Sequence, residues 1–144
     1  MTTPRWMKIV IWVLGAIGLL NGIAMFFAPA TWFFKMVPGV PETGPFNAHL
    51  VADSGTFFIA VGVGLLIAGY DPRRHVAAVI VAAVANLFHS ILHLYSHEAG
   101  LLSLEHLGTE VAGIYVPTLV LIMLAVMLSR NQPRSIAARA ARAA

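Results

Sequence analysis

The organisation of this chain follows from one stretch near its centre, Asn86-Leu87-Phe88-His89-Ser90-Ile91-Leu92-His93-Leu94-Tyr95-Ser96-His97. It ends an apolar run that starts at Val76, and a run of this length predicts a membrane-spanning helix. In that helix, Asn86 and the three histidines recur at i, i+3, i+7 and i+11, so they share one face. Imidazoles are costly in hydrocarbon unless they have polar partners. The stretch therefore predicts a polar cavity or an ion site, to which other helices supply partners.

The composition is that of a membrane protein. Of the 144 residues, 59% are hydrophobic and only 10% are charged, and the mean hydropathy is +0.83. The apolar residues come in long runs, which excludes an ordinary soluble domain. The chain has no cysteine, so metal ligands must come from other side chains, chiefly His, Asp and Glu. The pI near 9.8 does not indicate nucleic-acid binding, because the basic residues stand beside the apolar runs, where they direct topology.

Four apolar runs predict four transmembrane helices, at residues 9–28, 48–69, 76–95 and 104–128. Each has at least the ~20 residues that a helix needs to cross the ~30 Å hydrocarbon core of a bilayer. We therefore expect an all-α integral membrane protein, in which residues 1–128 form one four-transmembrane-helix bundle. The first run also resembles a secretory signal peptide, but it is longer than a typical signal core, which favours a retained helix.

The segments between and after the helices carry their own signals. Four prolines in residues 29–47 exclude a continuous helix and predict a structured outer loop that can act as a lid. Pro117 predicts a kink in the fourth helix. Glycines at positions 55, 62 and 69 predict a close-packed seam against a neighbouring helix. Residues 129–144 hold four arginines among alanines and are expected to form a basic cytoplasmic tail.

The basic residues predict the topology. The N-terminal lead, the turn at residues 70–75 and the tail hold eight of the nine Lys and Arg residues, and only Lys35 lies in the two opposite loops. Cytoplasmic loops are enriched in Lys and Arg. We therefore expect both termini to be cytoplasmic in a multi-pass protein of the bacterial inner (cytoplasmic) membrane. Residues 29–47 and 96–103 are then on the outer, periplasmic side.

With this topology, three helices bring ionisable side chains to the outer half of the bundle. Counted inward at ~1.5 Å per residue, Asp53, His93 and Glu110 lie about one turn below the interface, and His89 lies deeper. Imidazoles combined with carboxylates are typical ligands of copper, iron and zinc ions. The candidate metal ligands are His49, Asp53, His89, His93, His97, His106 and Glu110. The only acids at that depth, Asp53 and Glu110, are also the candidate catalytic groups.

Other interpretations stay open at this point. Side chains within a turn of the interface, such as His49, His97 and His106, can simply reach water, and the deeper groups can form a buried hydrogen-bond network. Carboxylates at the same level argue against a bis-histidine haem. A simple ion conduit is disfavoured because the inner half of the helices has almost no ionisable groups. A polar cavity closed on one side suits binding or catalysis better.

Several short motifs resemble those of known membrane proteins. They are Ala28-Pro29, Val37-Pro38-Gly39-Val40, Thr43-Gly44-Pro45-Phe46-Asn47-Ala48-His49 and Asp53-Ser54-Gly55. Together they cover about the first half of the chain and resemble small four-span bacterial membrane proteins of the DoxX-like type, a resemblance that implies no activity or residue roles. The His-x-x-x-His step at His89 and His93 is also similar to that of membrane hydroxylases and desaturases, but their further paired-histidine boxes are missing.

The sequence thus predicts a metal-binding integral membrane protein, with a metal-dependent oxidoreductase as the first enzyme class. A zinc-dependent hydrolase is a neighbouring alternative, in which Asp53 or Glu110 acts as general base toward a zinc-bound water. The alternative from a different class is a non-enzymatic accessory or structural subunit. The expected partners are the lipid bilayer, a membrane-accessible small-molecule substrate, and a second copy of the chain or a larger membrane protein.

Overall fold

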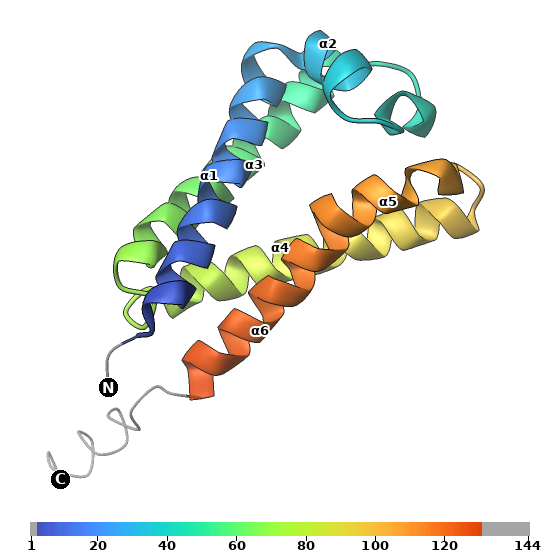
Figure 1. Cartoon of the computed structure of the whole chain (residues 1–144). Helices are drawn as coiled ribbons and strands as arrows, with labels where there is room; N and C mark the ends of the chain where they lie inside the picture. Colours follow the sequence, from blue (N-terminus) through green and yellow to red (C-terminus); the bar gives the residue numbers. More distant parts are fainter. Residues whose placement is uncertain (1–2, 131–144) are drawn as a thin grey trace, which may run out of the picture.

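The structure is a computed structural model that describes residues 3–130, and this part of the chain contains helices but no strand (Figure 1). Its long elements are α1 (Arg5–Phe27), α3 (Ala48–Tyr70), α4 (Val76–Glu98) and a last helical stretch, Leu104–Arg130. All four are long enough and apolar enough to cross a membrane. The predictions of an all-helical chain and of four such helices are therefore confirmed for the described residues. The predicted tail, apart from its first two residues, lies outside them.

A seam of glycines joins α1 and α3 into a tight hairpin. A Cβ atom at Gly62 of α3 would lie 2.5 Å from the backbone nitrogen of Leu19, and one at Gly22 of α1 would lie 2.7 Å from the Gly55 carbonyl oxygen. Real Cβ atoms do not approach backbone so closely, so these positions require glycine unless the helices separate. The seam accordingly contains the glycines at 55 and 62 that the sequence singled out, and small residues allow such close backbone contact.

The last helical stretch packs against α4 and changes its winding on the way. It begins with a 3₁₀ turn (Leu104–His106) and α5 (Leu107–Glu110), continues as a π-helical turn (Val111–Tyr115) and ends as α6 (Val116–Arg130). Pro117 has no N–H, and its ring clashes with the preceding turn of a regular α-helix. The π-helical turn directly before it is the adjustment found here, since π turns widen the helix locally.

The segment between α1 and α3 is a chain of short turns that follows its prolines. It contains α2 (Pro29–Thr31), a π-helical turn (Trp32–Met36) and a 3₁₀ turn (Val40–Thr43). The indole N–H of Trp32 donates to Oδ1 of Asn21 at 2.8 Å, which holds the segment on α1. The buried Phe33 anchors the segment in a small core with Met25 of α1 and Val51 of α3.

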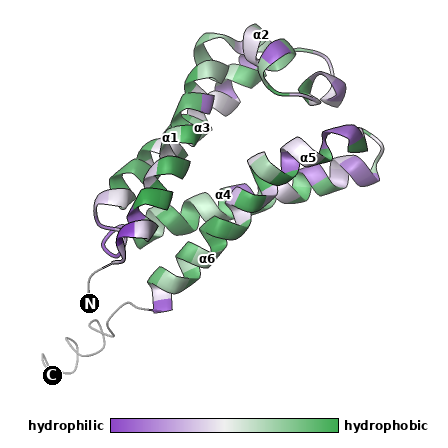
Figure 2. Cartoon of the chain, viewed as in Figure 1, coloured by the Kyte–Doolittle hydropathy of each residue, from purple (hydrophilic) through white to green (hydrophobic). Residues whose placement is uncertain are grey.

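The main core lies at the end of the molecule where the chain starts and α6 finishes, here called the terminal end. There the two hairpins, α1 with α3 and α4 with α6, meet around buried Ile11, Leu65, Val79, Leu121 and Leu124. Toward the opposite end, here called the loop end, the two hairpins diverge (Figure 1). Apolar residues cover the outer faces of the helices, and polar ones gather at the loops (Figure 2). Such apolar exteriors indicate a bilayer environment and hence a multi-pass membrane protein.

Candidate functional site

The structure distributes the seven predicted site residues over three places. One set lies between α4 and α5, a second joins the α1–α3 segment to the last helical stretch, and a third is on the exposed start of α3. The first set contains His89, His93, His97 and Glu110. The second contains His106, and the third contains His49 and Asp53. The contacts of the described chain therefore link the predicted residues in separate sets and do not bring all seven together.

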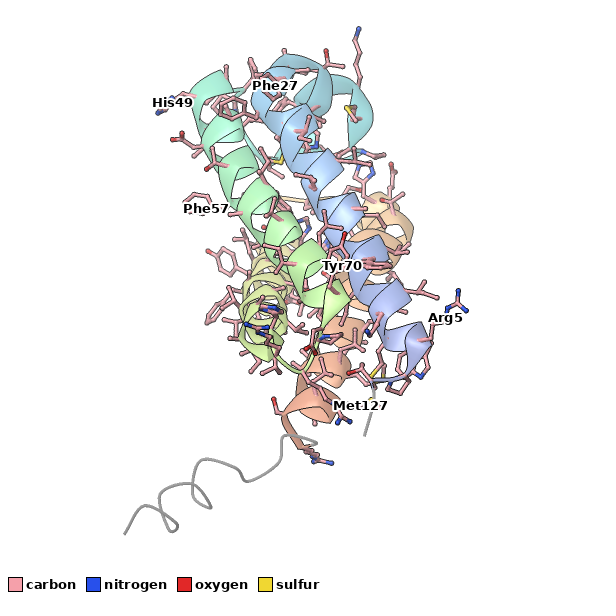
Figure 3. The ribbon with its side chains drawn as sticks, turned by 90° about the vertical axis from the view of Figure 1, so that its left-hand side faces the viewer. Arg5, Phe27, His49, Phe57, Tyr70 and Met127 are labelled. Carbon is pink, nitrogen blue, oxygen red and sulfur yellow. The ribbon has the colours of Figure 1, made fainter. Side chains whose placement is uncertain are left out.

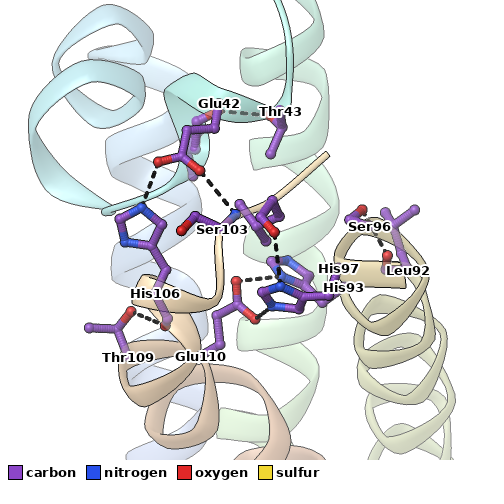
Figure 4. A network of polar contacts seen from close by, with 12 residues as sticks. Glu42, Thr43, Leu92, His93, Ser96, His97, Ser103, His106, Thr109 and Glu110 are labelled. Atoms are coloured by element: carbon purple, nitrogen blue, oxygen red, sulfur yellow. Dashed lines mark hydrogen bonds and ion pairs between the residues drawn. The ribbon is translucent and has the colours of Figure 1, made fainter. Parts of the chain in front are cut away.

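The first place is centred on the carboxylate of Glu110, which is buried between two imidazoles (Figure 4). Its Oε1 lies 3.2 Å from Nδ1 of His93, and its Oε2 lies 2.7 Å from Nε2 of His97. The two histidines are four residues apart on α4, so both project from one helix face. This face was predicted, and α4 extends beyond residue 95 to Glu98, which places His97 within the helix.

The hydrogen bonds of His97 define where its protons are. Its Nδ1 lies 3.1 Å from the carbonyl oxygen of Leu102, which can only accept, so Nδ1 carries a hydrogen and donates. The 2.7 Å contact between Nε2 and Glu110 then needs one further proton, either on the imidazole or on the carboxyl group. The two side chains are only 8% and 7% exposed. The pair therefore holds a proton in a site largely closed to solvent.

Two buried polar atoms beside this pair lack hydrogen bonds. Nδ1 of His93 is within ion-pair distance of Glu110 but is not aligned for a hydrogen bond, and it has no other partner among residues 3–130. The hydroxyl of Tyr115, in the π-helical turn after Glu110, is also buried and unpartnered within the described chain. Buried polar groups without partners are uncommon and call for an explanation, such as a bound ion or water.

His89 extends this group toward α3 through ring contacts. Its ring lies 4.7 Å from that of His93 and 6.1 Å from that of Phe58, both edge to face. These are the separations and geometry of favourable aromatic pairs. Within residues 3–130, His89 makes no hydrogen bond with Glu110, so it lies near the buried carboxylate without binding it.

The second place is a contact that the sequence did not reveal. Nε2 of His106 lies 2.7 Å from Oε1 of Glu42, and the backbone N–H of Ser103 donates to Oε2 of the same carboxylate at 3.1 Å (Figure 4). Gly39, at φ +82°, lets the segment approach, because a Cβ there would lie 2.8 Å from Cδ2 of His106. The His106 and Ser103 hydrogen bonds lower the pKa of Glu42 from its usual value.

The third place is isolated from the other two. Nε2 of His49 lies 3.2 Å from Oδ2 of Asp53, one turn away on α3, and the side chains are 88% and 57% exposed. His49 projects outward from the end of α3 (Figure 3). The predicted i, i+4 pairing of these residues is present, but neither contacts the buried carboxylate in the described chain. Water or lipid headgroups can satisfy an exposed pair of this kind.

A ready-made metal centre is not present within residues 3–130, where no group of three or more His, Cys, Asp or Glu side chains is arranged to hold an ion. The set that comes nearest in chemistry is His93, His97 and Glu110. Its donors fit a transition metal in type, and Nδ1 of His93 has no hydrogen-bond partner among the described residues. Their present contacts are with one another.

Comparisons with protein-family models, with curated proteins and with solved structures gave no match. The resemblance to DoxX-like proteins therefore stays a prediction, and any function has to be argued from the site itself.

Proposed function

We propose that this chain is a bacterial inner-membrane protein that binds one divalent transition metal ion, copper, iron or zinc, through His93, His97 and Glu110. The observation that supports it is the buried Glu110 carboxylate with an imidazole nitrogen beside each oxygen. Two imidazoles and one carboxylate are a ligand set of both zinc enzymes and non-haem iron proteins. His89, whose ring lies 4.7 Å from that of His93, is a neighbouring third imidazole.

The spacing of the donors is compatible with this proposal. Ligands bound at ~2.1 Å to one ion are roughly 3 Å apart when they are adjacent in its coordination shell. The two nitrogen–oxygen separations around Glu110 are 2.7 and 3.2 Å. An ion can thus enter by small rotations of the three side chains. It replaces the proton between His97 and Glu110, since metal ligands must be deprotonated.

The Leu102 carbonyl provides the outer support that a metal-ligating imidazole requires. It accepts from Nδ1 of His97 and leaves the Nε2 lone pair directed at Glu110. Histidine ligands usually donate their second ring N–H to such a carbonyl or to a carboxylate, which fixes the ring orientation. In this proposal Glu110 is a ligand, and Asp53, at the exposed start of α3, has no part in the ion site.

The test is metal analysis of the full chain, purified without chelator and with an affinity tag free of histidine. We expect about one transition metal ion per chain and loss of most of it in His97→Ala and Glu110→Ala. His49→Ala and His75→Ala are matched controls that should keep the ion. Binding of Zn²⁺ to metal-free protein should also release about one proton, because the shared proton is displaced.

The proposal is contradicted if folded protein contains no metal and takes up none, or if His49→Ala loses as much metal as His97→Ala. Oxidoreductase activity with a redox-active ion, or hydrolysis by a zinc-bound water, each presupposes the ion. Substrate assays with lipid-soluble compounds therefore follow the metal analysis.

A second candidate function is a structural one, favoured by the absence of a prearranged metal group among the described residues. In that case the three side chains form a network that fixes α4 against the last helical stretch of an accessory subunit. Removing one partner of a buried pair is strongly destabilising. A metal-free wild type with a large loss of thermal stability in Glu110→Ala would favour this function.

A further inference from the structure

A hollow lies between α3 and α4, next to His89. Its volume is about 180 Å³, and its lining residues are Phe57, Phe58, Val61, Ala85, Asn86 and His89. Phe57 is 72% exposed, and its side chain projects outward from α3 (Figure 3). The hollow therefore opens to the exterior of the helices. In a bilayer this opening faces lipid.

The size of the hollow limits what it can hold. A cavity of ~150 Å³ lined by apolar side chains admits benzene. The present volume of about 180 Å³ therefore holds one six-membered ring with a small substituent. The two phenylalanines provide surfaces against which a ring can pack face to face or edge to face.

One wall of the hollow is polar, and its side chains have hydrogen-bonding groups without partners in the described chain. Asn86 and His89 are three residues apart on α4 and share a face. Nδ2 of Asn86 donates to the Ala82 carbonyl at 2.9 Å, which leaves its Oδ1 as an open acceptor. His89 makes ring contacts with Phe58 and His93, and neither of its ring nitrogens forms a hydrogen bond within residues 3–130. An apolar hollow with an open acceptor beside an imidazole selects a ligand that can both donate and accept.

From these observations we propose that the hollow is a binding site for a single-ring, lipid-soluble phenol. The ring occupies the space beside Phe57 and Phe58. The hydroxyl donates to Oδ1 of Asn86 and accepts from the ring N–H of His89, so both polar groups gain a partner. This site does not depend on a metal ion at Glu110, and it goes beyond the proposed metal binding.

The experiment compares 4-fluorophenol with fluorobenzene, which lacks only the hydroxyl. Binding to the full chain in lipid nanodiscs, after treatment with chelator, is followed by ¹⁹F NMR, with empty nanodiscs as the blank. We expect saturable binding of the phenol and about tenfold weaker binding of fluorobenzene, since two neutral hydrogen bonds together contribute about that factor.

Two variants locate the binding in the hollow. Ala85→Leu fills it and should abolish binding of both compounds, whereas Ala77→Leu, the same change at an exposed position of α4 outside the hollow, should leave binding unchanged. His89→Phe keeps an aromatic ring but removes the hydrogen bond, so the phenol should bind only as weakly as fluorobenzene. Asn86→Leu should also weaken binding of the phenol, and it replaces His89→Phe in the experiment if that variant does not fold.

The proposal is overturned if the phenol shows no saturable binding, if Ala85→Leu and Ala77→Leu weaken it equally, or if fluorobenzene binds as tightly as the phenol. The last result assigns the hollow to apolar occupants such as acyl chains. Because the protein is free of metal in these measurements, their failure is separate from a failure of the metal proposal.

Discussion

Glu42 and His106 lie 2.7 Å apart across 64 residues of sequence, and their contact joins the two hairpins at the loop end. Glu42 also accepts from the Ser103 backbone N–H, so one carboxylate holds both the turn after α4 and the start of the last helical stretch. The buried Glu110 is one helical turn after His106. The contact therefore holds the α1–α3 segment next to the stretch that carries Glu110, and pH can test it.

The first prediction concerns the pH dependence of this contact. The pKa of Glu42 is lowered by the His106 and Ser103 hydrogen bonds, so its stabilising effect is complete above the ordinary carboxyl pKa and is lost as pH falls through the lowered value. We expect the contact to persist at pH 4.5 and to open at more acidic pH. Spin labels on cysteines introduced at Pro45 and Leu104 should then report a narrow distance distribution that broadens.

Glu42→Ala should broaden the same distribution already at neutral pH, because neither His106 nor Ser103 retains its acceptor. Glu105→Ala is the matched control, since Glu105 is an exposed acid next to His106. The Glu105 side chain forms no hydrogen bond or ion pair within the described chain. A distribution that stays narrow in Glu42→Ala would show that other contacts hold the segment in place.

The second prediction concerns the glycine seam between α1 and α3. Gly62→Ala places a methyl group 2.5 Å from the Leu19 nitrogen, so the helices must separate, and overpacking typically costs about 1–3 kcal/mol. Gly64→Ala meets only Ala78 at 3.8 Å and gains helix propensity of about 1 kcal/mol. In thermal unfolding followed by circular dichroism, we expect a lower midpoint for Gly62→Ala and an unchanged or higher one for Gly64→Ala.

The third prediction concerns a buried pair of hydroxyls between α4 and α6. Ser90 and Thr118 are 2.8 Å apart, and the Thr118 hydroxyl also lies within hydrogen-bond distance of the carbonyls of Ile114 and Asn86. Thr118→Val keeps the shape and removes these bonds. Since such bonds between membrane helices are worth roughly 0.6–1.7 kcal/mol, we expect a small but measurable loss of thermal stability.

The exposed Thr56, whose hydroxyl donates only to the Asp53 carbonyl on its own helix, provides the control variant Thr56→Val. A double-mutant cycle of Ser90→Ala with Thr118→Val should give a coupling free energy near that of one hydrogen bond. Additive effects in this cycle would mean that the two hydroxyls do not interact.

The fourth prediction is the topology. The chain has no native cysteine, so single cysteines can be placed at Pro45 and Ser129, both exposed. If the Lys and Arg distribution directs insertion, a membrane-impermeant maleimide should label position 45 in intact spheroplasts and position 129 only after permeabilisation. The reverse pattern would place the candidate site on the cytoplasmic side.

Local sequence was enough to specify the helices and one helix face. Apolar runs of about 20 residues can only satisfy their backbone in lipid as helices, and a spacing of four residues places His93 and His97 together whatever surrounds them. Both histidines accordingly lie beside Glu110. The glycines at positions 55 and 62 likewise indicated a seam, because absence of a side chain is what close helix contact requires.

Only the tertiary structure decided which polar groups meet. Periodicity fixes the face of a helix but not its rotation against its neighbours, and between helices in lipid no hydrophobic force selects that rotation. For this reason His49 and Asp53 form a separate exposed pair. Counted along the helices from the outer interface, their predicted depths match those of the other site residues. The contact between Glu42 and His106 depends on the path of a turn-rich segment and on a left-handed Gly39. Such a contact depends on the backbone conformation of every turn in the segment, so a local sequence pattern does not predict it.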